Sequence, residues 1–471
     1  MALSPEILSL LSREFGERLD LSPQILAECA ADASGIAGVP EAVLLAQDAA
    51  DVSRLLILAN EHGFPVIPRG GGSGLAGGAV AHRGGVVLSL AGLSRILRIS
   101  PADMIAEVEP GVITLSLRQE AEKLGLCYPP DPAGMDLSTI GGNAATNAGG
   151  PSCLKYGVTR DYVLGLQAVL PSGEIIRTGA GTRKSVAGLD LTRLLVGSEG
   201  TLAVITALTL KLIPKPQAAV ALAALFPDPA TATRAVTAVF QAGVFPCALE
   251  FMDRACLTLV ADLLPFPITG PGAAMLLVEL DGSPQAAALD AERAAWIMDQ
   301  AGATRVLPPV SGQERENLWA VRRQISLRIH EQAAVYLPED VAVPLSRIPD
   351  LIDRLAELGQ RFSLSIFAFG HAGDGNIHVN ITAEAESGRE RAEECASALV
   401  TDVLAMGGTI SGEHGVGLAK KKFLPLELSP ANLALQQGIK ALLDPNNVLN
   451  PGKVLPDRTA SALVRDQDLK K

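Results

Sequence analysis

A predicted strand that runs directly into a glycine-rich loop is the feature that most constrains the fold of this chain. Residues 48–63 carry apolar side chains at helical spacing and end at Gly63, which predicts a helix. The apolar stretch 64–68 predicts a strand, and the loop 69–78 that follows it has six glycines in ten residues. The closely spaced backbone N–H groups of such a loop can approach a pyrophosphate. The pattern predicts an α/β segment that binds an anion, with a flexible surface turn as the alternative.

Residues 72–77 match the pattern G-x-G-x-x-G, but the rest of a dinucleotide-binding Rossmann site is missing. Residues 79–85 do not suit the helix that must follow, and no acidic residue stands at a strand end about twenty positions on. The pattern G-x-x-x-x-G-K-[ST] does not occur either. The sequence therefore argues against a nicotinamide-type Rossmann site and against a P-loop.

The composition indicates a globular α/β protein of two or three domains. The chain has 471 residues, of which 48% are hydrophobic and only 4% aromatic, with 46 glycines and 31 prolines. Its net charge of −12, from 39 basic and 51 acidic residues, argues against a nucleic-acid partner.

The sequence favours a cytoplasmic protein, peripheral to a membrane only through a partner. Glu6 and Arg13 interrupt the apolar residues of the N-terminus, so a signal peptide is not expected. No uncharged apolar run reaches transmembrane length. The six cysteines have no C-x-x-C spacing, which argues against a ferredoxin-type cluster and a disulfide framework.

The segment 214–216, Pro-Lys-Pro, marks the first predicted domain boundary. Strands are expected before it at 86–90, 105–108, 164–178 and 200–213. After it, helices are expected at 230–242, 284–301 and 346–361, and strands at 274–280, 340–343 and 365–369. The expected domains are an N-terminal domain with the glycine-rich loop at 1–217, a second domain with an antiparallel sheet at 218–405, and a C-terminal helical segment at 406–471.

Half of the six histidines lie in two short motifs, 371–378 (His-Ala-Gly-Asp-Gly-Asn-Ile-His) and 411–415 (Ser-Gly-Glu-His-Gly). Asp374-Gly375 favours a two-residue hairpin turn, and counting outward from it pairs His371 directly with His378. Cβ atoms in such a pair lie about 4.5–5.5 Å apart, so both rings can reach one metal ion. The alternative is a pair of structural imidazoles bonded to the backbone.

Four further segments, 129–132, 138–150, 155–157 and 197–202, resemble in that order the flavin-binding segments of the vanillyl-alcohol-oxidase-type FAD fold. The likeness is greatest to the branch with D-lactate dehydrogenases, D-2-hydroxyglutarate dehydrogenases and the FAD subunit of glycolate oxidase, and it covers residues 38–456. The resemblance implies an α+β protein with a two-subdomain FAD-binding domain, a ferredoxin-like substrate and metal domain, and a C-terminal segment that returns to the flavin.

The resemblance also implies which residues bind FAD. Relatives with covalent flavin often carry a histidine inside the glycine loop, where this chain has glycines, so non-covalent FAD is expected and His82 is interpreted as a turn residue. The implied FAD contacts are Pro68, Arg69, Gly70, Gly71, Gly72, Ser73, Gly74, Pro130, Asp131, Ser138, Thr139, Gly142, Asn143, Asn147, Gly149, Tyr156, Gly157, Glu199, Gly200 and Ile205.

By the same resemblance, Glu413 is the third metal ligand beside His371 and His378, and His414 is the catalytic base. Zn²⁺ is the expected ion, with Fe²⁺ or Mn²⁺ as alternatives. Three protein ligands leave coordination positions open for substrate. An imidazole is suited to accept the hydroxyl proton of a 2-hydroxy acid near neutral pH.

Other residues are expected to hold the substrate. The segment Trp319-Ala-Val-Arg322 resembles a family segment whose arginine grips the substrate carboxylate, with Ser326 as a second contact. A charge on a surface helix is the alternative for Arg322. Asn450 is expected at the flavin edge, or simply in a turn before proline.

The resulting functional hypothesis is an FAD- and metal-dependent dehydrogenase of D-2-hydroxy acids, with D-lactate as first choice. No lysine stands at 337–340, where 2-hydroxyglutarate enzymes place one, which favours a short monocarboxylate. The alternatives are the FAD subunit of a glycolate oxidase complex, a D-2-hydroxyglutarate dehydrogenase, and a non-catalytic flavin electron-relay subunit. The expected electron acceptor is an iron–sulfur subunit, an electron-transfer flavoprotein or a quinone. A homodimer is left open.

Overall fold

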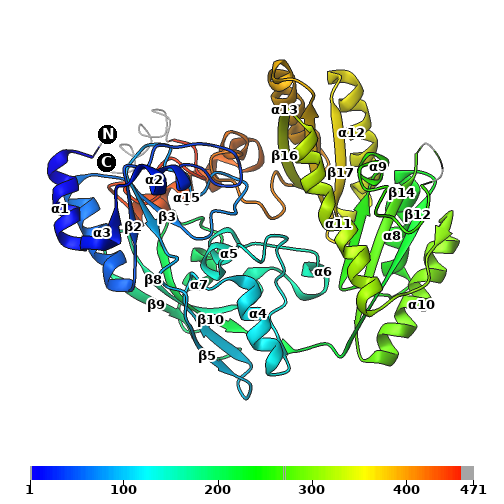
Figure 1. Ribbon diagram of the computed structural model, residues 1–471, viewed down its shortest axis with the longest axis horizontal. Helices are drawn as coiled ribbons and strands as arrows, with labels where there is room; N and C mark the ends of the chain where they lie inside the picture. Colours follow the sequence, from blue (N-terminus) through cyan, green and yellow to red (C-terminus); the bar gives the residue numbers. More distant parts are fainter. Residues whose placement is uncertain (1–2, 269, 271, 458–471) are drawn as a thin grey trace. The chain divides into compact units, whose positions relative to one another are not determined.

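The computed structural model describes residues 3–268, 270 and 272–457 (Figure 1). The chain divides into two compact units. The first comprises Met1–Ala148, Val158–Pro214 and Glu413–Lys471, and the second comprises Gly149–Gly157 and Lys215–Gly412. The C-terminal segment therefore folds with the N-terminal half of the chain.

The first unit begins with a four-stranded sheet in the order β1-β2-β4-β3, in which β2, β4 and β3 are parallel. Helix α3 covers it, beginning after its N-cap Asp48 and ending at Gly63, which adopts the left-handed conformation expected of a helix C-cap. The predicted helix 48–63 is confirmed. The strands are β1 (Leu19–Asp20), β2 (Ala42–Leu45), β4 (Val86–Ser89) and β3 (Val66–Arg69).

A second, antiparallel sheet of the first unit has the order β5-β6-β10-β8-β9. Its strands are β5 (Ile96–Ser100), β6 (Ile105–Val108), β10 (Val204–Lys211), β8 (Val163–Val169) and β9 (Ile175–Gly179), and β7 (Leu126–Cys127) pairs separately with β11 (Ile213–Pro214). The helices of this unit are α1 (Pro5–Phe15), α2 (Pro23–Glu28), α3 (Ala49–His62), α4 (Thr114–Lys123), α5 (Ile140–Thr146), α7 (Leu191–Leu195), α14 (Leu424–Glu427) and α15 (Pro430–Leu443).

The second unit is built on a seven-stranded antiparallel sheet in the order β15-β12-β14-β13-β17-β18-β16. The strands are β15 (Arg305–Val306), β12 (Ala218–Phe226), β14 (Ala274–Gly282), β13 (Ala248–Met252), β17 (Ser365–His371), β18 (Asn376–Ala383) and β16 (Val335–Ala342). The helices are α6 (Cys153–Tyr156), α8 (Pro229–Gln241), α9 (Arg254–Leu259), α10 (Pro284–Gln300), α11 (Gly312–Gln332), α12 (Ile348–Phe362) and α13 (Arg389–Ala405).

Helices cover both faces of this sheet, as the alternation of buried residues along β12 shows. Leu222 and Phe226 pack in one core with α8, α10, α12 and α13. Ala223 and Leu225 pack in a second core with α9 and α11. The helices predicted at 230–242, 284–301 and 346–361 are α8, α10 and α12, so these predictions are confirmed.

The hairpin of β17 and β18 is present, but its predicted register is wrong. His371 pairs with Asn376, and Phe369 pairs with His378. The loop therefore has four residues rather than two. Inside it, Asp374 N–H donates a hydrogen bond to the carbonyl oxygen of His371. At its end, the carbonyl oxygen of Gly375 accepts a hydrogen bond from Val343 N–H, which holds the longer loop in place. The shift equals two residues, the period of a strand, so both imidazoles still lie on one face of the sheet.

Candidate active site

The glycine loop of the first unit lies directly against the segment that leads into α5. A Cβ atom would lie 2.4 Å from Thr139 Oγ1 if added to Gly70, and 2.2 Å from the carbonyl oxygen of Leu137 if added to Gly71. Only glycine permits this approach. The backbone N–H groups of residues 71–74 donate no hydrogen bond to any residue that the structure describes. These donors fit the diphosphate of a dinucleotide cofactor.

Residues that open α5 form a buried polar network beside this loop. Thr139 caps the helix by accepting a hydrogen bond from Gly142 N–H at 3.2 Å. Asn143 Nδ2 donates to Thr114 Oγ1 at 2.7 Å, and Thr114 shares a 2.9 Å hydrogen bond with Ser138 Oγ. The network fixes the N-terminal turn of α5 in place.

Arg118 on α4 orients the proline-rich segment at 129–131. Its Nη1 atom donates to the carbonyl oxygens of Tyr128, Pro129 and Pro130 at 3.0, 2.9 and 3.1 Å. No local motif marks Arg118 in the sequence, because it acts through backbone carbonyls ten to twelve positions away.

Hydrogen bonds join the C-terminal segment to the loops of the first unit that contain Gly78 and Glu199. Asn450 Nδ2 donates to the carbonyl oxygens of Gly78 and Glu199 at 3.1 and 2.8 Å. Lys453 Nζ donates to the same Gly78 oxygen at 2.7 Å and to Asn450 Oδ1 at 2.6 Å. The Glu199 carboxylate accepts from the N–H groups of Val416 and Gly417, each at 2.8 Å.

These hydrogen bonds surround the buried Lys453, which no sequence motif assigned to the site. Burial lowers the pKa of Lys453 from 10.5 to about 7, against the opposing influence of Asp32 and Glu199. Asn450 has a φ of +46° and so occupies the left-handed conformation of a turn. Its predicted place at the flavin edge stays a prediction.

In the second unit, a row of polar side chains crosses the sheet on the face covered by α11. Glu250 is fully buried on β13; its Oε1 lies 2.5 Å from His371 Nδ1, and its Oε2 accepts from Arg322 Nε at 2.7 Å. Burial alone would raise the pKa of Glu250, but the charges of His371 and Arg322 outweigh it and lower the pKa to about 2. An ionised Glu250 would favour a proton on Nδ1 of His371, and a metal ion would then be bound through Nε2.

Two histidines of this row and Glu413, the residue after Gly412, form a group of possible metal ligands. The ring centroids of His371 and His378 are 5.0 Å apart, and ligand atoms of His371, His378 and Glu413 lie within 4.8 Å of one another. A second group of the same kind consists of Asp340, His378 and His414. Two imidazoles and a carboxylate are a donor set that catalytic zinc sites use. The residues present therefore fit a divalent ion.

Arg322 lies on α11 with 9% of its surface exposed. Its Cζ atom lies 4.4 Å from the centroid of the Phe369 ring, which is a cation–π contact. Its Nε atom forms an ion pair with Glu250. Ser326, one helical turn further along α11, is exposed. The surface-charge alternative for Arg322 is thus wrong, while the contact of Arg322 and Ser326 with substrate stays a prediction.

Glu250 was not predicted from the sequence as a site residue. An acidic residue inside the apolar run 248–252 was a signal for it.

Tyr156 and its neighbour Lys155 are bonded within the second unit. The Tyr156 hydroxyl donates to Asp281 Oδ2 at 2.6 Å, and Lys155 Nζ lies 2.5 Å from Asp281 Oδ1. Asp281 lies near the end of β14. The predicted FAD contacts of Tyr156 and Gly157 stay predictions.

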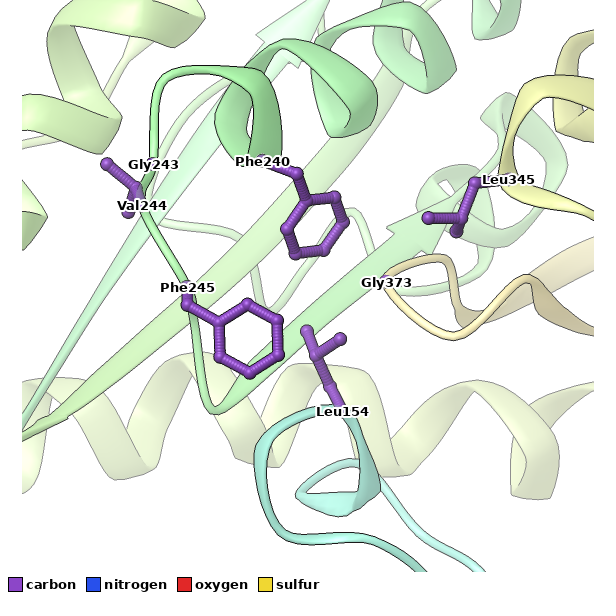
Figure 2. A pocket seen from close by; sticks show the side chains of 7 residues that line it. All are labelled: Leu154, Phe240, Gly243, Val244, Phe245, Leu345 and Gly373. Carbon is purple, nitrogen blue, oxygen red and sulfur yellow. The ribbon is translucent and has the colours of Figure 1, made fainter.

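An apolar groove of about 480 Å³ lies elsewhere in the second unit (Figure 2). Phe240 of α8 and Leu345 pack with the core on the α8 face of the sheet, whereas His371 bonds to residues on the α11 face. We therefore do not assign the groove to the metal ligands. Its lining residues are Leu154, Phe240, Gly243, Val244, Phe245, Leu345 and Gly373.

Two family descriptions match the chain, an FAD binding domain at residues 40–179 and the C-terminal domain of FAD linked oxidases at residues 215–454. The chain belongs to the FAD-linked oxidase family. Among its relatives, the glycolate oxidase subunit GlcD of Bacillus subtilis is 38% identical over 91% of this chain and 92% of its own length. A D-lactate dehydrogenase of Anaerostipes hadrus is 36% identical over 96% of this chain and 98% of its own length.

Solved structures of this oxidase fold agree with the architecture. p-Cresol methylhydroxylase superposes with a TM-score of 0.80 at 18% sequence identity, covering 97% of this chain and 98% of its own. The predicted vanillyl-alcohol-oxidase-type fold, the FAD cofactor and the oxidoreductase class are confirmed. No helix among the described residues has the length and apolar character needed to cross a bilayer.

Membership of this FAD-linked family makes the glycine loop directly testable. We expect Gly71→Ala to raise the FAD dissociation constant by about tenfold or more, because overpacking of this kind typically costs roughly 1–3 kcal/mol. FAD titration of the apoprotein, followed by flavin fluorescence, measures the change. Gly438→Ala is the matched control, since Gly438 lies in α15 outside the implied FAD contacts and a Cβ there would meet nothing within 4 Å. Equal FAD affinities for the two variants would contradict this role of the loop.

Proposed function

We propose that this protein is a metal-dependent flavoprotein dehydrogenase that oxidises a short D-2-hydroxy acid, D-lactate in the first place, to the 2-oxo acid. The observation that carries the proposal is the ligand group of His371, His378 and Glu413, with His371 held by the buried Glu250. Relatives named D-lactate dehydrogenase and glycolate oxidase subunit support the substrate class.

The chemistry requires removal of a proton from the substrate hydroxyl and of a hydride from the same carbon. When bound, the metal supplies Lewis acidity at the substrate oxygens, and FAD supplies the hydride acceptor. His371, His378 and Glu413 would hold the ion and leave positions open for the hydroxyl and carboxylate oxygens. His414, which follows Glu413 directly, would accept the hydroxyl proton.

Other residues would set the orientation of the reacting groups. Glu250, which contacts Nδ1 of His371, would favour the tautomer that binds the ion through Nε2. Arg322 carries a charge that is always present and would attract the substrate carboxylate with its terminal nitrogens while its Nε stays on Glu250.

The residues on β16 favour a short monocarboxylate. Glu339 and the fully buried Asp340 stand in the stretch where a lysine would be needed to bind a distal carboxylate. A second carboxylate on the substrate would meet like charges there. D-Lactate and glycolate therefore fit this proposal better than D-2-hydroxyglutarate.

The electrons taken from the substrate must leave the protein. We propose an iron–sulfur subunit, an electron-transfer flavoprotein or a quinone as acceptor, and the name glycolate oxidase subunit among the relatives supports a partner-dependent complex. Any association with a membrane would then be peripheral and made through that partner.

Anaerobic bleaching of the bound flavin by D-lactate, L-lactate, glycolate and D-2-hydroxyglutarate tests the proposal. We expect D-lactate to reduce the flavin fastest, with glycolate next, and D-2-hydroxyglutarate at least about tenfold slower, a difference of roughly 1.4 kcal/mol in barrier. Reduction by L-lactate alone would contradict the stereochemistry. Bleaching by none of the four acids would favour an electron-relay subunit.

A further inference from the structure

A second buried carboxylate faces the other histidine of the ligand group. Asp340 on β16 is fully buried and stands directly opposite His378 in the pairing of β16 with β18. Its Oδ1 atom lies 3.5 Å from His378 Nδ1, which is ion-pair distance but longer than a good hydrogen bond. Glu250 likewise faces Nδ1 of His371, but at the hydrogen-bond distance of 2.5 Å.

The Asp340 carboxylate also accepts a hydrogen bond from the strand that carries His378. Asn376 Nδ2 donates to Asp340 Oδ1 at 2.6 Å and to the carbonyl oxygen of Val341 at 2.9 Å. Asn376 precedes His378 by two residues, so the bond fixes the start of β18 against β16. Asp340 therefore holds the strand that carries the histidine as well as facing its ring.

Asp340 also anchors the segment that leads into Glu413 and His414. Ser411 Oγ donates to Asp340 Oδ2 at 3.3 Å, and Gly412 N–H donates to the backbone oxygen of Asp340 at 3.3 Å. Gly412 has no room for a side chain, since a Cβ there would lie 2.3 Å from Asn376 Nδ2. The backbone of Gly412, to which Glu413 is joined, is thus held in place.

We propose that Asp340 is a positioning residue that sets both His378 and the Ser411–Gly412 bend for metal binding, an inference that rests on the proposed metal site. A carboxylate beside each Nδ1 atom would favour binding of the ion through Nε2 of His371 and of His378. Residues that orient metal-ligating histidines in this way typically contribute about 10–100-fold to metal affinity.

The test is a zinc titration of metal-free, FAD-loaded protein in competition with a chromophoric chelator. We expect Asp340→Asn, which preserves shape, to weaken zinc affinity by about 10–100-fold. Asp444→Asn is the matched control, because Asp444 is equally buried and bonds Val448 N–H and Leu449 N–H in the first unit. It should lower the melting temperature and leave zinc affinity within about twofold of wild type.

Each outcome tests either the role of Asp340 or the proposed metal site. Wild-type affinity in Asp340→Asn, together with loss of affinity in His378→Ala, would overturn the role of Asp340 and leave the metal site standing. Unchanged affinity in His378→Ala would overturn the metal site itself. If Asp340→Asn does not fold, Ser411→Ala takes its place: about threefold weaker zinc binding supports the proposal, and wild-type binding overturns it.

Discussion

Replacing His414 with Gln is expected to lower kcat for D-lactate by about 10²–10⁴-fold, the usual contribution of a positioned general base. The variant keeps a polar side chain of similar size but cannot take up the hydroxyl proton. FAD content and metal content should stay at wild-type levels, because the proposed metal ligands are His371, His378 and Glu413. Stopped-flow measurement of flavin reduction under anaerobic conditions isolates the affected step.

The pH profile separates the loss of a base from a change in structure. In wild type, reduction should slow at low pH as the base becomes protonated, and this limb should vanish in His414→Gln. His82→Gln is the control, since it removes a half-buried imidazole from the first unit. A reduction rate within threefold of wild type in His414→Gln would exclude His414 as the base.

Glu250→Gln is expected to reduce both stability and metal affinity. The substitution leaves the buried Arg322 without its ionised partner, and breaking a buried ion pair from one side typically costs roughly 3–5 kcal/mol. It also removes the carboxylate from His371 Nδ1, which should weaken metal binding by about 10–100-fold. Urea unfolding measures the first effect and chelator competition the second.

Glu279→Gln is a matched control from the same sheet. Glu279 is a largely buried carboxylate on β14 that accepts from Arg315 Nη1 at 2.8 Å and from Trp319 Nε1, both on α11, and no histidine contact of its side chain is present among the described residues. It should lose stability without losing metal affinity. If Glu250→Gln binds the metal as tightly as Glu279→Gln does, Glu250 has no role in setting His371.

Local signals were sufficient to predict the secondary structure that carries the site. Asp48 and Gly63 bound α3 by capping, and residues 105–108 were predicted as the strand that is observed as β6. The placement of His371 and His378 on one face followed from strand alternation, which survives a register shift of two residues. These features depend on neighbours in sequence.

The register and the supporting residues depend on partners far along the chain. The loop 372–375 is pinned by Val343, some thirty residues earlier, so the preference of Asp374-Gly375 for a tight turn did not decide its length. Glu250 meets His371 at a separation of 121 residues, and Lys453 meets Gly78 at a separation of 375. Periodicity carries no information about such pairs.

Oxidation of the hydroxy acid is expected to need a divalent ion held by His371, His378 and Glu413. The most direct measurement is the rate of anaerobic flavin reduction by D-lactate before and after prolonged dialysis against a chelator, with FAD content checked in both samples. We expect the rate to fall by at least about 10²-fold, because the ion would stabilise the developing alkoxide, and to return when Zn²⁺ or Mn²⁺ is added. An unchanged rate in metal-free, FAD-replete protein would contradict this expectation.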